Sequence, residues 1–218
     1  MNCHLELDSK EIFEIIKKEK TLEATYVSIM NKYYDNACFD DSQKAVLSST
    51  IQKLSLKLNE NNIKFWIDWG TFLGAYRNNN IIPWDKDFDI SIMSRDKSKL
   101  LSVLNEESKE LSIKEEKENF ISLNINEINR GLDIYIWDKI EKSNGTFLDD
   151  NFCAIRPSKF FEKLDSIKLD DLGLTLPCPN LKYAKDLLTA AYGKGFMLPP
   201  GNPILMDNGQ HWTENRGT

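Results

Sequence analysis

Three aspartates at alternate positions, Asp85, Asp87 and Asp89, constrain the structure of this chain more than any other feature of its sequence. A β-strand points successive side chains to opposite faces, so a strand over residues 87–93 places Asp87 and Asp89 together. The other face of that strand is then apolar and carries Phe88, Ile90 and Ile92. A solvated strand edge is the alternative, but like charges on one face cost stability unless a cation lies between them. Hard oxygen ligands suit Mg²⁺, which also binds substrate phosphates, so the run predicts metal-assisted phosphoryl chemistry.

A turn at Gly70-Thr71 precedes this strand. Aromatic and β-branched residues over 63–69 predict a strand, which enters a short helix that ends near Arg77. The first N–H groups of a helix lack intrahelical partners and bind anions. Thr71, Gly74 and Arg77 share one helical face, and a guanidinium offers a fork of donors to phosphate. The segment is therefore a candidate anion site, and a purely structural turn with a helix-end arginine is the alternative.

A third carboxylate, Asp133, lies within an apolar strand predicted over residues 132–137. A buried charge is costly without a partner, so an acid in this position usually pairs with another group or with a metal. We interpret Asp138, at the predicted end of that strand, as a turn residue. Asp68 lies at the end of the strand before the turn and is interpreted as either a hydrogen-bonded structural acid or a substrate contact.

Hydrophobic periodicity predicts an α+β fold in one main domain. Residues 9–61 are predicted to be helical, with a break at Asp40-Asp41-Ser42 that caps the second helix. Further helices are predicted over 97–111 and 180–192, and a strand over 120–125, whereas 155–176 shows a mixed pattern. We divide the chain into an N-terminal helical region (1–61), a catalytic domain (62–200) and a tail (201–218).

The composition restricts the partners and the compartment. The net charge is −6 and the basic residues are scattered, which argues against a nucleic-acid-binding surface. The four cysteines form no CxxC pair, and Cys3 with His4 matches no zinc spacing, which predicts reduced thiols in a cytoplasmic protein. No apolar run approaches the roughly 20 residues of a membrane span, and the N-terminus shows no signal peptide. A peripheral position at a membrane and the oligomeric state stay open.

The turn and the acidic run together resemble the LicD/fukutin family. The resemblance begins with residues 70–77 (Gly-Thr-Phe-Leu-Gly-Ala-Tyr-Arg) and 82–90 (Ile-Pro-Trp-Asp-Lys-Asp-Phe-Asp-Ile). It continues, within about 63–200, at three later segments: 132–135, 176–188 and 192–199. It implies a nucleotidyltransferase-like mixed sheet with flanking helices and an N-terminal helical extension. Phe72 in place of leucine and Lys86 in place of an acid depart from the family pattern.

The resemblance also implies an activity. Members of the family transfer a phospho-substituent, phosphocholine or ribitol phosphate, from a CDP-activated donor to a glycan hydroxyl. By position, Asp87 and Asp89 would bind Mg²⁺, with Mn²⁺ as the alternative. Asp133 would complete the metal site and is also the candidate general base.

The resemblance assigns the remaining site residues to the substrate. Gly70 and Thr71 would contact the donor phosphates, Arg77 would stabilise those phosphates or the site loop, and Asp85 would orient the loop or a metal-bound water. Two other functions stay open: a nucleotidyltransferase that transfers a nucleoside monophosphate to a small molecule or protein, and a non-catalytic binding module. The donor head group, the acceptor and the number of metal ions are left undetermined.

Overall fold

The computed structural model describes residues 38–106, 109–151, 154–194 and 196–197, with isolated positions 14, 17, 18, 24 and 28 before them. These isolated positions are helical, as predicted for residues 9–61. The rest of the first predicted helix, Cys3, His4, Cys153 and the segment from 198 to the C-terminus lie outside the described residues. The helices are α3 (Asp41–Glu60), α4 (Trp69–Asn78), α5 (Lys97–Glu106) and α6 (Ala184–Tyr192), with short 3-10 turns η1 (Ser94–Asp96), η2 (Ser158–Phe160) and η3 (Leu181–Tyr183). The strands are β1 (Phe65–Ile67), β2 (Asp87–Met93), β3 (Leu111–Glu116), β4 (Phe120–Ile125), β5 (Arg130–Lys142), β6 (Gly145–Asp149), β7 (Ile155–Pro157), β8 (Asp165–Leu169) and β9 (Leu174–Cys178).

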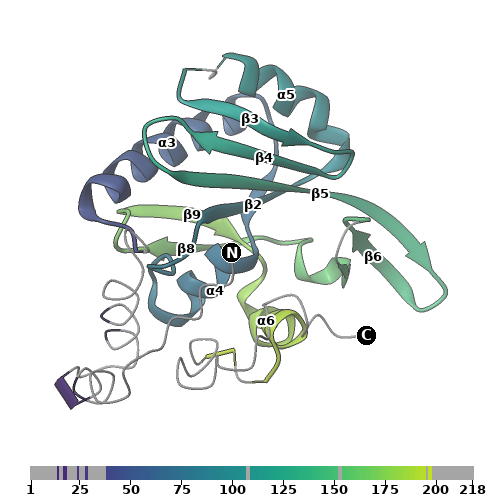
Figure 1. Ribbon diagram of the computed structural model, residues 1–218. Coiled ribbons are helices and arrows are strands. Elements are labelled where there is room, and N and C mark those ends of the chain that lie inside the picture. The colour runs from purple at the N-terminus through teal and green to yellow at the C-terminus, as the bar shows by residue number, and fades with distance from the viewer. Residues whose placement is uncertain are drawn as a thin grey trace, which may run out of the picture.

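The main sheet is mixed, as the resemblance implied. Its strands follow the order β1-β2-β5-β4-β3, and β6 and β7 extend it along the second half of β5. The pair β2–β5 is parallel, whereas the other pairs of the sheet are antiparallel. Figure 1 shows α3 and α5 beside the β3–β4 end of the sheet, and α4 and α6 beyond β2. The α+β class is therefore confirmed, and the sheet brings the N-terminal ends of β2 and β5 side by side.

Helix α3 begins where the sequence predicts a cap. The Asp40 carboxylate accepts a hydrogen bond from the Gln43 backbone N–H at 2.7 Å, and the Gln43 side chain accepts from the Asp40 N–H at 3.2 Å. This reciprocal pair satisfies two backbone donors that the helix itself leaves unpaired. The helix then buries residues at helical spacing in the main core: Leu47, Ile51, Leu54 and Leu58.

Removal of this cap should destabilise the protein measurably. We expect Asp40→Ala to lower the free energy of unfolding by about 0.5–2 kcal/mol, because the Gln43 N–H loses its acceptor. Urea unfolding followed by circular dichroism measures the change. Asp41→Ala is the matched control, because Asp41 is exposed in the first turn and the helix is capped by its neighbour. Equal losses in the two variants would contradict the assignment of the cap.

Several predicted boundaries were wrong. Strand β5 continues to Lys142, so Asp138 is paired with Asp149 inside a strand and is not a turn residue. The helix predicted over 97–111 ends at Glu106 among the described residues, and Leu111 begins β3. The mixed pattern of 155–176 corresponds to three short strands and a 3-10 turn. Among the described residues, no helix is both long enough and apolar enough to span a membrane.

Candidate active site

A tight strand–turn–helix connection from β1 to α4 forms one wall of the site. The sequence pattern placed Asp68 at the end of a strand, but in the structure it is the N-cap of α4. Its Oδ1 accepts a hydrogen bond from the Trp69 N–H at 2.9 Å. The Asp68 N–H donates to the Asp89 carbonyl at 3.1 Å, which continues the antiparallel pairing of β1 with β2. The start of α4 therefore lies directly against β2.

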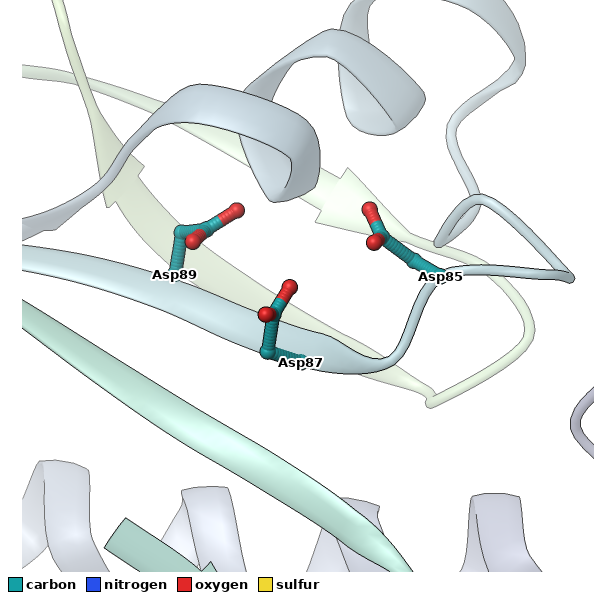
Figure 2. Close-up of side chains that lie close together, drawn as sticks. All are labelled: Asp85, Asp87 and Asp89. Atoms are coloured by element: carbon teal, nitrogen blue, oxygen red, sulfur yellow. The ribbon is translucent and has the colours of Figure 1, made fainter. Parts of the chain in front are cut away.

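Three carboxylates meet beside this helix start. Asp85 precedes β2, Asp87 is the first residue of the strand and Asp89 lies two residues further. One oxygen of each lies within 4.8 Å of the others, and Figure 2 shows the three side chains directed into one space. Asp87 and Asp89 thus share a face, as alternation predicts, and Asp85 joins them. A substrate-binding role was predicted for Asp85, and the loop before β2 brings its carboxylate to the other two acids.

Gly70 brings the backbone of α4 close to two of these acids. A Cβ atom at this position would lie 2.5 Å from Asp85 Oδ2 and 3.1 Å from Asp89 Oδ2. The first of these distances is far shorter than any van der Waals contact, so a side chain here would displace the Asp85 carboxylate. Glycine permits this close approach because it has no Cβ.

Thr71 fixes Asp89 from both sides. The Thr71 N–H donates to Asp89 Oδ2 at 3.2 Å, and the Thr71 hydroxyl accepts from the Asp89 N–H at 2.7 Å. Thr71 is buried, at 3% exposure, so these contacts orient a carboxylate of the site. Direct contact of Gly70 and Thr71 with donor phosphates stays a prediction.

Arg77 lies at the opposite end of α4 from Gly70. Its Nε donates to the carbonyl of Phe196, and it lies seven positions after Gly70, about 10 Å along the helix axis. The structure therefore does not bring Arg77 together with the three acids. Its role toward the donor phosphates or the site loop stays a prediction.

Asp133 lies on β5 as the direct neighbour of Asp89 in the parallel β2–β5 pair. It is half-buried and is not one of the three acids whose oxygens cluster. Burial raises the pKa of Asp133 to about 6, with a further increase from the Asp87 charge and an opposing effect of a hydrogen bond from Ser122. Asp133 thus lies one strand away from Asp85, Asp87 and Asp89, which we call the acid group. Its assignment as metal ligand and general base stays a prediction.

Burial and mutual repulsion raise the pKa values of the three clustered acids. Burial, followed by the charge of Asp87, raises the pKa of Asp85 to about 7. Burial also raises the pKa of Asp87, and it raises that of Asp89 well above its ordinary value with added repulsion from Asp87, Asp85 and Asp133. A divalent cation would relieve this repulsion, and a set of carboxylate oxygens is the ligand type that Mg²⁺ and Mn²⁺ prefer. The donor set therefore fits the predicted metal.

Tyr192, the last residue of α6, also belongs to this region. Burial raises the pKa of its phenol well above the ordinary value, and the charge of Asp89 raises it further. The hydroxyl therefore keeps its proton at neutral pH. Tyr192 belongs to the family resemblance over 192–199, but no role was predicted for it.

A comparison with protein-family models identifies the domain. The model for the LicD/FKTN/FKRP nucleotidyltransferase domain matches residues 62–180, more than half of the 218 residues. The chain belongs to the LicD/FKTN/FKRP family. The match includes β1, α4, β2 and β5, and with them Asp68, Asp85, Asp87, Asp89 and Asp133.

Curated relatives of this LicD-family chain match over shorter segments. An uncharacterized protein of Rickettsia typhi is 39% identical over 104 residues, which are 48% of this chain and 31% of the relative. Human ribitol-5-phosphate transferase FKTN is 31% identical over 97 residues, 41% of this chain and 20% of that protein. The chain thus spans less than a third of the length of either relative.

Solved structures give a weaker likeness. The lincomycin-bound lincosamide antibiotic adenylyltransferase LnuA is 15% identical with a TM-score of 0.42, over 62% of this chain and 80% of that chain. A putative nucleotidyltransferase from Thermotoga maritima is 13% identical with a TM-score of 0.40, over 63% of this chain and 80% of that chain. Likeness at this level supports no inference about the site of the LicD-family chain.

The raised pKa of Asp85 predicts how pH and Mg²⁺ affect stability. At pH values between 3.8, the ordinary pKa, and about 7, Asp85 in the native protein retains a proton that it has lost in the unfolded chain. The metal-free LicD-family domain should therefore lose stability as pH rises through this window. Because Mg²⁺ competes with that proton, its stabilising effect should grow over the same range, to about 2.7 kcal/mol at 100 times its Kd. Urea unfolding with Mg²⁺ or with EDTA, repeated across the window, measures both effects. The Mg²⁺ effect should be small at all pH values in Asp85→Asn; a pH-independent effect in the unmodified chain would contradict the prediction.

Proposed function

We propose that this chain transfers a phospho-substituent, phosphocholine or a polyol phosphate, from a CDP-activated donor to a glycan hydroxyl. The observation that carries the proposal is that the carboxylates of Asp85, Asp87 and Asp89 cluster beside Gly70 at the start of α4. Membership of a family that includes a human ribitol-5-phosphate transferase supports the reaction class.

Each part of the site has a task in this reaction. Asp85, Asp87 and Asp89 would hold Mg²⁺, or Mn²⁺, with Asp133 beside them on β5. When bound, the ion neutralises charge on the diphosphate and on the leaving group. Gly70 lets the Asp85 and Asp89 carboxylates lie close to the start of α4, and the donor phosphate would bind at this helix start, where the helix dipole favours negative charge. Thr71 holds Asp89 through one hydrogen bond from its N–H to the carboxylate and one from the Asp89 backbone N–H to its hydroxyl.

The acceptor requires a base. In the proposed reaction the acceptor hydroxyl oxygen forms a bond to the β-phosphorus of the donor, the bond from that phosphorus to CMP breaks, and the hydroxyl proton passes to a carboxylate. Asp133 is our candidate, because its pKa of about 6 lies close to neutral pH, where a general base works best. At neutral pH most of this carboxylate is ionised and able to accept the proton.

Calorimetry with CDP-linked compounds tests the donor class. We expect CDP-choline or CDP-ribitol to bind in the presence of Mg²⁺, and binding to be lost in EDTA and in Asp87→Asn. Asp138→Asn is the control. Asp138 and Asp133 are five residues apart on β5, so strand alternation places their side chains on opposite faces of the sheet. The absence of binding by every CDP compound, with binding of ATP or another nucleoside triphosphate, would overturn the proposal.

A nucleotidyltransferase is the second candidate, because the matching family model describes a nucleotidyltransferase domain. The two reactions differ in their products, since a nucleotidyltransferase adds a nucleotidyl group and releases pyrophosphate rather than CMP. Mass spectrometry of the acceptor product separates them. Nucleotide binding without any dependence on metal would instead indicate a binding module, which has no need for three mutually repelling carboxylates.

A further inference from the structure

Arg156 is a buried cation next to the turn that precedes the acid group. It lies on β7, a three-residue strand that pairs with β6 beyond the main strand order. Its side chain is 7% exposed, and its Nη1 lies 2.7 Å from Asp68 Oδ1. Its guanidinium carbon lies 3.9 Å from the centroid of the Trp69 ring and 4.8 Å from that of Trp137. A planar guanidinium held by a carboxylate and two indole rings has little freedom to reorient.

Asp68, the partner of Arg156, has hydrogen bonds to both of its carboxylate oxygens. Oδ1 accepts from the Trp69 N–H in addition to Arg156, whereas Oδ2 accepts from the Ser91 hydroxyl at 2.7 Å and from Trp66 Nε1 at 3.3 Å. Asp68 is 1% exposed, so its charge depends on these partners rather than on water. Loss of Arg156 would leave a buried carboxylate without its counter-charge.

The same pair holds a strained residue. Trp69 has a φ angle of 41°, a left-handed conformation that is unfavourable for a large side chain. Its N–H is bound by Asp68 and its ring is covered by Arg156, so the ion pair secures both the backbone and the side chain. The next two residues are Gly70, which approaches Asp85 and Asp89, and Thr71, which binds Asp89.

We propose that Arg156 is a positioning residue that holds the Trp69 turn, and through it Gly70 and Thr71, against the carboxylates of Asp85 and Asp89. Arg156 acts through Asp68 and Trp69 rather than by contact with the reacting atoms. Its importance for metal binding rests on the proposed function, whereas its effect on the turn does not.

Two measurements on the full chain test this role. In Arg156→Met, hydrogen–deuterium exchange should become at least about tenfold faster at the amides of Trp69 and Thr71, with no change in β3 and β4, because only the turn opens more often. Mn²⁺ affinity, followed by electron paramagnetic resonance, should fall by roughly 10- to 100-fold, the usual effect of removing a group that orients metal ligands. Arg156→Lys restores a charge opposite Asp68 but not the planar stack, so both effects should be partly rescued.

Lys97→Met is the matched control. Lys97 is also partly buried and bonded to protein, through the Lys117 and Glu118 carbonyls and Glu116, but these contacts lie at the β3–β4 turn. Its substitution should lower stability without changing either measurement at the acid site.

The outcomes separate the two proposals. Unchanged exchange at Trp69 and Thr71 in a folded Arg156→Met variant overturns the positioning role. Absence of Mn²⁺ binding in the unmodified chain refutes the metal-dependent function, while the exchange result still decides the role of Arg156. If Arg156→Met does not fold, the double variant Asp68→Asn/Arg156→Met removes both buried charges and gives the same decision: fast exchange at the turn supports the role, and protection equal to that of the unmodified chain overturns it.

Discussion

Replacement of Asp89 by asparagine should lower the rate of the proposed transfer by about a thousandfold or more, and should raise the stability of the metal-free protein. The loss of activity follows from the position of Asp89 in the acid group, because several kcal/mol of transition-state stabilisation by a bound metal correspond to about three factors of ten in rate. The fold should survive, since an asparagine oxygen still accepts the Thr71 N–H that now bonds to Asp89 Oδ2.

The expected gain in stability has an electrostatic cause. Asp89 is 4% exposed, and its pKa is raised well above the ordinary value by burial and then by Asp87, Asp85 and Asp133. Asparagine cannot ionise and so avoids the cost of burying a carboxyl group beside other acids, and we expect the free energy of unfolding at neutral pH, in EDTA, to rise by roughly 0.5–2 kcal/mol. Opposite effects on function and stability are typical of a strained active site and are not expected of a structural acid.

A CMP-release assay and urea unfolding measure the two effects of Asp89→Asn. Asp170→Asn is the control, because the Asp170 carboxylate is 52% exposed and pairs with Lys168 on the surface. Full activity in Asp89→Asn would remove this residue from the catalytic machinery. A loss of stability would show instead that the carboxylate supports the fold.

Gly70→Ala should reduce Mg²⁺ affinity by roughly 10- to 100-fold, comparable to other changes that disturb the orientation of metal ligands. The added methyl group would lie 2.5 Å from Asp85 Oδ2 and 3.1 Å from Asp89 Oδ2, so at least one carboxylate must move. Alanine otherwise favours helix by about 1 kcal/mol over glycine, so the variant should fold. Calorimetric titration with Mg²⁺ measures the affinity, and circular dichroism verifies the fold.

Gly131→Ala provides a matched control beside the same acids. A Cβ at Gly131 would lie 3.4 Å from the Leu123 carbonyl oxygen and 3.5 Å from the Asp87 Cβ, which are ordinary contact distances. Mg²⁺ affinity should therefore remain close to that of the unmodified chain. Equal affinities in Gly70→Ala and Gly131→Ala would contradict the close approach of α4 to the acid group.

Local patterns in the sequence predicted the elements that carry the acids. Strand β2 has the predicted bounds, because alternation of acids and apolar residues over 87–93 is a property of the strand itself. Helix α4 lies within one residue of its predicted span, and Asp40 caps α3 as expected. These features depend on residues that are near one another along the chain, so they were accessible without the fold.

Tertiary structure decided which groups meet. The inclusion of Asp85 with Asp87 and Asp89 depends on the path of the loop before β2, and the position of Asp133 beside Asp89 depends on the parallel register of β5. The ion pair of Asp68 with Arg156 joins residues that are 88 positions apart, so no local sequence pattern predicts it. Short strands such as β8 and β9 are likewise stabilised by pairing with each other. Periodicity in the sequence thus determined the acidic strand and its two faces. Which residues come together in the site was decided by long-range contacts, because their energies depend on distances in space that a linear sequence does not contain.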